Sequence, residues 1–133
     1  MEKYIELLKK LNKKAIKNGD IPVSAIIIHN NKIISKAYNL KYKNSDPFAH
    51  AEILAIKKAC KKLKTPNLSE CEMYVSLLPC NMCLEVIKES KIKKVYYFTE
   101  KTKIINSKTK LIKINSESSY FSKELSMFFS DKR

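Results

Sequence analysis

The chain has 133 residues, of which 44% are hydrophobic, and it contains one glycine and four prolines. This length and composition predict one folded domain over residues 1–133 and disfavour a disordered chain. No apolar run approaches the roughly 20 residues needed to cross a bilayer, and the N-terminal segment lacks the apolar core of a signal peptide. We therefore expect a cytoplasmic protein with no membrane partner.

The charge balance is strongly basic. The 27 basic residues, all but one of them lysine, face 13 acidic residues, and the formal net charge is +14. Such an excess attracts polyanions, chiefly nucleic acid, because neutralised phosphates release counterions. A merely solvated surface that reflects biased codon usage is the other explanation. That bias accounts for lysine over arginine better than for lysine over glutamate, so the charge favours a nucleic-acid partner.

Apolar periodicity predicts four helices, and β-type runs predict five strands. The helices are expected, in chain order, at residues 2–18, 49–63, 79–90 and 120–130. The strands are expected at residues 23–28, 32–37, 73–77, 95–98 and 111–114. Gly19 suits the end of the first helix, and Asn30-Asn31 suit a tight hairpin because asparagine tolerates positive φ. Strands that alternate with helices after a hairpin predict an α/β fold with a mixed sheet.

Two short segments carry the chemistry, His50-Ala51-Glu52 and Pro79-Cys80-Asn81-Met82-Cys83. One imidazole and two thiolates are three zinc ligands, and they leave a fourth tetrahedral position for water. Structural zinc sites are usually closed by four protein ligands, so this set is typical of a catalytic zinc. The Glu52 carboxylate, two residues after the histidine, is suited to move protons to and from that water.

The positions of these residues on predicted helices support one shared site. His50 and Glu52 fall in the first turn of a helix, and Cys80 begins the next helix with Cys83 on the same side. Unpaired amides at a helix start favour thiolate there. Taken alone, the CxxC pair would also suit redox chemistry or a structural zinc. The other two cysteines, Cys60 and Cys71, are expected to be small buried side chains rather than ligands.

The HAE segment followed by PCxxC resembles the zinc-dependent cytidine-deaminase-like superfamily. Within it, the chain is most similar to the bacterial tRNA-specific adenosine deaminases. The similarity is carried by residues 18–31, 46–59, 76–83 and 124–129. This resemblance implies a three-layer fold with a mixed five-stranded sheet and one Zn²⁺ per subunit, bound by His50, Cys80 and Cys83. It also implies hydrolytic deamination of adenosine to inosine at the tRNA wobble position, carried out by a homodimer.

The resemblance assigns further roles, residue by residue. Glu52 would be the catalytic proton carrier, and Asn39 would hydrogen-bond the purine. The remaining substrate contacts implied are Val23, Ala51, Leu77, Pro79, Phe128 and Phe129, with the Ala51 and Cys80 amides also facing the oxyanion. Read alone, Asn39 also fits a turn at a strand end, Val23 and Leu77 fit core positions, and one of the two phenylalanines fits the core.

Two departures from the family pattern matter. Leu78 stands where most members carry a glutamate, which removes a polar group behind the ligands. Segment 99–110 is lysine-rich and has no glycine, where relatives have a glycine-rich loop. Its lysines could make nonspecific phosphate contacts. Two other functions stay open: a deaminase of a free base or nucleotide such as guanine, cytosine or dCMP, and an inactive zinc-stabilised RNA-binding module.

Overall fold

Residues 1–101 and 107–131 are described in the computed structural model of the chain. The helices are α1 (Glu2–Lys17), α2 (Ala51–Leu63), α3 (Asn81–Ser90) and α4 (Ser118–Asp131). The strands are β1 (Ser24–His29), β2 (Lys32–Tyr38), β3 (Cys71–Leu77), β4 (Lys94–Thr99) and β5 (Lys110–Lys113). Of the lysine-rich segment 99–110, residues 102–106 lie outside the described part of the chain.

The five strands form one mixed sheet in the order β2-β1-β3-β4-β5. β1 pairs antiparallel with both β2 and β3, whereas β4 pairs parallel with β3 and with β5. The expected α/β class with a mixed five-stranded sheet is therefore confirmed. β3 begins at Cys71, two residues earlier than predicted, because Cys71 and Glu72 pair with the end of β1.

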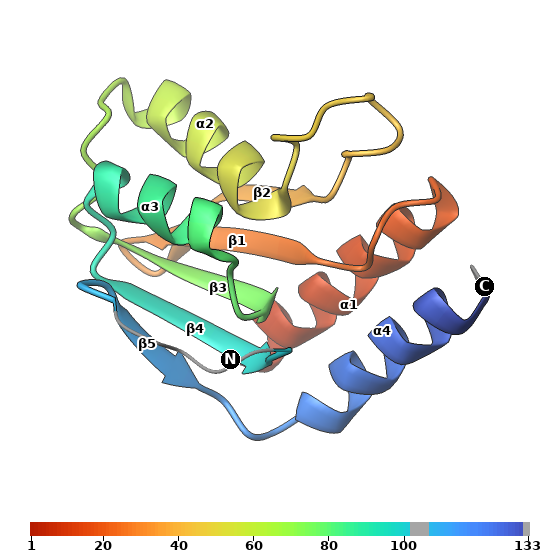
Figure 1. Ribbon diagram of the computed structural model, residues 1–133. Helices are drawn as coiled ribbons and strands as arrows, with labels where there is room; N and C mark the ends of the chain where they lie inside the picture. Colours follow the sequence, from red (N-terminus) through yellow and green to blue (C-terminus); the bar gives the residue numbers. More distant parts are fainter. Residues whose placement is uncertain (102–106, 132–133) are drawn as a thin grey trace.

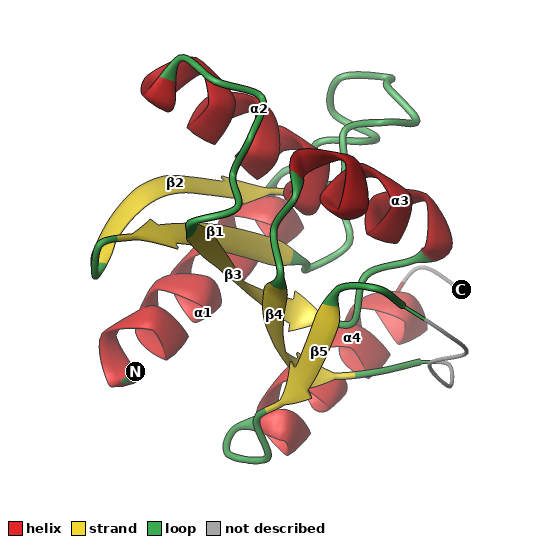
Figure 2. Cartoon of the chain, turned by 90° about the vertical axis from the view of Figure 1, so that its left-hand side faces the viewer, coloured by secondary structure: helices red, strands yellow, loops and turns green. Residues whose placement is uncertain are grey.

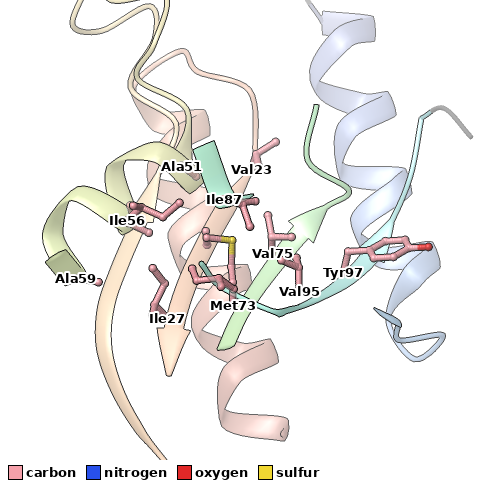
Figure 3. Packing of buried hydrophobic residues seen from close by; sticks show 14 of the residues in the cluster. Val23, Ile27, Ala51, Ile56, Ala59, Met73, Val75, Ile87, Val95 and Tyr97 are labelled. Atoms are coloured by element: carbon pink, nitrogen blue, oxygen red, sulfur yellow. The ribbon is translucent and has the colours of Figure 1, made fainter. Parts of the chain in front are cut away.

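Helices cover both faces of the sheet, so the fold has three layers (Figure 1). α2 and α3 lie on one face, and α1 and α4 lie on the other (Figures 1 and 2). Alternate side chains of each central strand supply the two cores. Ile27, Met73 and Val95 gather beneath α2 and α3, as Figure 3 shows. On the opposite face, Ile26 and Phe98 pack with side chains of α1 and α4.

Three positive φ angles explain the turns that precede the site. Gly19 has φ 78°, and the Gly19 and Asp20 amides donate to carbonyls of the last turn of α1, at 2.9 Å each. This closes the helix as predicted, since glycine adopts such angles without strain. Asn30 and Asn31 have φ 51° and 61°, which confirms the tight hairpin.

The two site helices begin later than predicted. α2 starts at Ala51 with His50 as its N-cap residue, and α3 starts at Asn81 with Cys80 as its N-cap. Both cap residues have extended backbone, with ψ 146° and 172°. The two ligands therefore precede the helices instead of lying within them. In the described residues, no helix is both long and apolar enough to cross a membrane.

Candidate zinc centre and catalytic pocket

The two N-cap residues bring the predicted ligands together. α2 and α3 lie side by side on one face of the sheet (Figure 1). The Nδ1 atom of His50 is 3.5 Å from the Cys83 sulfur and 3.9 Å from the Cys80 sulfur. Cys83, in the first turn of α3, is fully buried, and Cys80 is exposed at the helix start. The CxxC spacing thus places one sulfur inside the core and one at the pocket surface.

The spacing of these three atoms fits a tetrahedral zinc ion. Zinc bonds of about 2.3 Å to sulfur and 2.0 Å to nitrogen put such ligand atoms roughly 3.5–3.8 Å apart in a tetrahedron. The observed separations of 3.5 and 3.9 Å match this, and all three ligand atoms lie within 4.8 Å of one another. In the described part of the chain the group has three members, which leaves a fourth position for solvent or substrate.

Glu52 lies beside this ligand set, in the first turn of α2. Its side chain is 4% exposed and lies beside the Cys83 thiol. Burial raises the pKa of Glu52 to about 7. A bound zinc ion acts in the opposite direction, since a nearby positive charge favours the carboxylate. As a carboxylate Glu52 can accept a proton from a neighbouring group, and as a carboxylic acid it can donate one.

The two thiols influence each other. A hydrogen bond from Cys83 lowers the pKa of Cys80 to about 5, and the same bond together with burial raises the pKa of Cys83. Further hydrogen bonds to Cys80 come from the Met82 and Cys83 backbone at the start of α3. One sulfur is therefore prepared as a thiolate, whereas the other must lose its proton when a metal binds.

Asn39 connects the hairpin to α2. It follows β2, and its backbone N–H donates to the Val23 carbonyl at 3.1 Å. This bond forms because the antiparallel hairpin sets the end of β2 beside the start of β1. The Asn39 side-chain oxygen Oδ1 accepts from the Ala51 amide at 2.8 Å, and both residues are buried. The Nδ2 group of Asn39 then remains as a hydrogen-bond donor at the pocket.

This contact differs from one sequence expectation. The Ala51 amide, expected to face the oxyanion, donates to Asn39 instead. The reason is the backbone register: Leu40 donates to the Ala49 carbonyl at 3.0 Å, which holds Asn39 against the first turn of α2. The buried Asp20 carboxylate secures the intervening loop by accepting from the Tyr42 and Lys43 amides, at 2.8 and 3.2 Å.

A pocket of about 250 Å³ opens above the ligands, beyond the carboxyl ends of β3 and β4. Seven of the residues predicted for the site line it: Val23, Asn39, His50, Glu52, Leu77, Pro79 and Cys80. Ile21, Leu78 and Lys101 line it as well, although none of these was predicted as a contact. The position of Ile21 beside Pro22-Val23 was a signal that it could line the pocket. No sequence signal distinguished Lys101 from the many other lysines.

The two phenylalanines of α4 point to different places. Phe129 is half-buried and lines a second cavity of about 500 Å³ next to Lys101. Phe128 is buried and lines a groove together with Ile16 of α1, on the other side of α4. The rings still touch edge to face, with centroids 5.5 Å apart. Only Phe129 is therefore near the catalytic end, and substrate contacts of either ring remain predictions.

Three zinc ligands beside a buried carboxylate, on a three-layer α/β fold, are typical of proteins with a catalytic zinc site. The family model described as the cytidine and deoxycytidylate deaminase zinc-binding region matches residues 1–99, and the chain belongs to this family. The predicted zinc cofactor is thereby confirmed, with His50, Cys80 and Cys83 placed to bind it.

Individual relatives are consistent with this assignment. A tRNA-specific adenosine deaminase from Aquifex aeolicus (strain VF5) is 45% identical over 96 residues, 72% of this chain and 64% of that protein. The match thus spans less than two thirds of that relative's length. A structure from studies of A-to-I editing by tRNA:A34 deaminases at the wobble position of transfer RNA has a TM-score of 0.81. It is 23% identical and supports the fold, covering 91% of this chain and 99% of that one.

One solved structure with another activity is also similar. Guanine deaminase from Bacillus subtilis is 39% identical, with a TM-score of 0.65, over 70% of this chain and 62% of that one. The proteins similar to this chain therefore include one named as a tRNA-specific adenosine deaminase and one named as a guanine deaminase, so the substrate must be argued separately.

Proposed function

We propose that this protein hydrolyses adenosine to inosine at the wobble position of a tRNA anticodon loop. The observation that carries the reaction type is the buried Glu52 carboxyl beside the His50–Cys80–Cys83 ligand set, at the base of a 250 Å³ pocket. The similarity to the Aquifex aeolicus enzyme and the net charge of +14 support the substrate.

The proposed chemistry needs a nucleophile and a proton carrier. Zinc, when bound, supplies water made acidic enough to act as a nucleophile near neutral pH. Glu52 takes one proton from that water as oxygen attacks C6 of adenine. It delivers this proton to the ring nitrogen, then takes the proton of the new C6 hydroxyl and delivers it to the amine, which departs as ammonia while the C6 carbonyl forms. Adenosine and water thus become inosine and ammonia, and Glu52 returns to its starting state.

Residues of the pocket wall orient the base. The Nδ2 group of Asn39, whose Oδ1 is held by Ala51, can donate to a ring nitrogen of the purine. Val23 and Leu77 offer apolar contacts to the faces of the base. A base enters such a pocket only when it is unstacked, as bases in a single-stranded loop can be.

The runner-up is deamination of a free base, which the similarity to guanine deaminase favours. Purified zinc-loaded protein should be incubated with total tRNA, and separately with guanine, cytosine and dCMP. The tRNA proposal expects inosine at an adenosine wobble position, read by sequencing. Rapid ammonia release from guanine without inosine in any tRNA would contradict it. An inactive RNA-binding module predicts no product from either.

We propose one domain over residues 1–133, assembled as a homodimer in which RNA contacts both subunits, as the family resemblance implies. We also propose the cytoplasm as its location, because tRNA is found there. Size-exclusion chromatography with light scattering would test the dimer, since a monomeric mass at micromolar concentration contradicts it.

A further inference from the structure

Lys101 stands between the catalytic pocket and the second cavity. It lines the 250 Å³ pocket together with Asn39 and Glu52, and it also lines the 500 Å³ cavity together with Phe129. It follows β4 at the carboxyl edge of the sheet, and no other lysine in the described part of the chain lines the pocket. A ligand that fills both cavities must pass the Lys101 side chain.

The Lys101 ammonium is held by an aromatic ring and not by a carboxylate. Its Nζ atom lies 3.9 Å from the centroid of the Phe129 ring, a cation–π contact. Burial lowers the pKa of Lys101. The adjacent Glu100 carboxylate accepts from the Lys113 ammonium at 2.6 Å. No ion pair within residues 1–101 and 107–131 includes Lys101, so its positive charge is available to an anion.

The second cavity suits the sugar and phosphate of a neighbouring nucleotide. Hydroxyl groups of α4 line it at intervals of four residues, so they share one helix face: Ser122, Ser126 and Ser130. Serine hydroxyls and lysine ammonium groups are common partners of phosphate and sugar oxygens. The one acidic residue in the lining, Glu100, is already paired with Lys113. The Phe129 ring adds a flat apolar surface for a base.

We propose that Lys101 is a substrate-positioning residue that binds the phosphodiester next to the target nucleotide, while the second cavity receives the flanking nucleotide. This inference rests on the proposed function, since a free base has no phosphodiester. Lys101 is then a specific phosphate contact within the lysine-rich segment 99–110. The target base enters the catalytic pocket and its backbone runs out past Lys101, so the phosphate charge meets the ammonium at the pocket mouth.

The test uses zinc-loaded protein and an anticodon stem-loop with adenosine at the wobble position. Binding is measured over a series of salt concentrations for wild type, Lys101→Ala, Lys101→Arg and Lys32→Ala. Lys32 is an exposed lysine at the β1–β2 hairpin, at the other end of the sheet, so its substitution controls for net charge. A second stem-loop carries an uncharged methylphosphonate in place of the phosphate on the 5′ side of the target nucleotide. A third stem-loop carries the same replacement on the 3′ side.

Lys101→Ala should lower the slope of log affinity against log salt by about 0.7–0.9, the contribution of one phosphate contact. Lys101→Arg and Lys32→Ala should keep that slope. One of the two methylphosphonates should weaken wild-type binding by about tenfold and have little further effect on Lys101→Ala, as expected for partners in one contact. Turnover by Lys101→Ala should show a raised KM with a smaller change in kcat.

An unchanged salt slope in Lys101→Ala overturns the inference. So does a methylphosphonate penalty equal in wild type and Lys101→Ala at both positions, or a wild-type protein that fails to bind the stem-loop. These readouts are binding constants and do not need turnover. Failure of the proposed function appears separately, as an absence of inosine in the stem-loop bound by wild-type protein.

Discussion

Replacing Asn39 with alanine removes one observed hydrogen bond and one proposed substrate contact, and two variants allow their effects to be separated. The side-chain Oδ1 accepts from the buried Ala51 amide at 2.8 Å, and Nδ2 remains for the substrate. The change leaves the buried Ala51 amide, in a residue that is 0% exposed, without its hydrogen-bond acceptor. Asn39→Ala should therefore reduce both the stability of the protein and its activity.

The size of the stability loss follows from the buried amide. Leaving a buried donor unsatisfied costs about 1–3 kcal/mol. Unfolding entropies of about 2.1 cal/mol/K per residue give roughly 0.28 kcal/mol/K for 133 residues. A loss of about 2 kcal/mol then lowers Tm by roughly 7 °C. Differential scanning calorimetry on zinc-loaded protein measures this directly.

Asn39→Asp is the matched control. An aspartate oxygen can still accept from the Ala51 amide, and a negative charge is favoured at the start of a helix. The second oxygen of the aspartate can only accept a hydrogen bond, whereas the Nδ2 group of asparagine donates one. The proposed purine substrate therefore loses a hydrogen-bond donor in the pocket. Asn39→Asp should hold most of the wild-type Tm and still lose turnover by about tenfold or more. A wild-type Tm in Asn39→Ala, or full turnover in Asn39→Asp, would refute this account of Asn39.

Three further results are expected. Glu52→Gln should lower turnover by about 10²–10⁴-fold, because an amide carries no transferable proton, while metal analysis still finds zinc; turnover within tenfold of wild type contradicts the role of Glu52. Cys83→Ser should lose zinc and unfold at a lower temperature, because metal binding is coupled to folding. The control variant Cys60→Ser should keep its zinc. Equal zinc content in the two variants would contradict the ligand set. Burial raises the pKa of Glu124 above its ordinary 4.5, so its ionisation destabilises the folded state as pH rises above that value. Glu124→Gln should therefore gain Tm at pH 7 and little at pH 4, helped by a new donor for Asn12 Oδ1, which has no partner among the described residues. The same gain at both pH values would show that ionisation of Glu124 is not the cause.

Several local features were predictable because they depend on residues close together in the chain. Two adjacent asparagines were sufficient for the hairpin, since their positive φ angles need no distant partner. The pairing of β1 with both β2 and β3 was not predictable, and it lengthened β3 to Cys71. Helix starts were displaced by two residues, since His50 and Cys80 adopt extended backbone as cap residues.

The distribution of roles within the pocket depended on contacts across the fold. Leu78 is buried in the apolar core and also lines the pocket. Its position before the PC motif indicated only that a polar group is missing there. Phe128 and Phe129 are adjacent in sequence, yet the helix turns one toward the α1 groove and the other toward the catalytic end. Asn39 and Ala51, twelve positions apart, form one buried bond.

By itself, the sequence predicted the zinc ligands and the carboxylate that lies beside them. Residue types and short spacings are sufficient for that, because metal chemistry accepts few donors and a CxxC at a helix start brings its two sulfurs close together. Only the tertiary structure decided which further side chains line the pocket. Ile21, Leu78 and Lys101 come from three separate segments, and packing of the sheet edge against α2 and α3 brings them to one pocket.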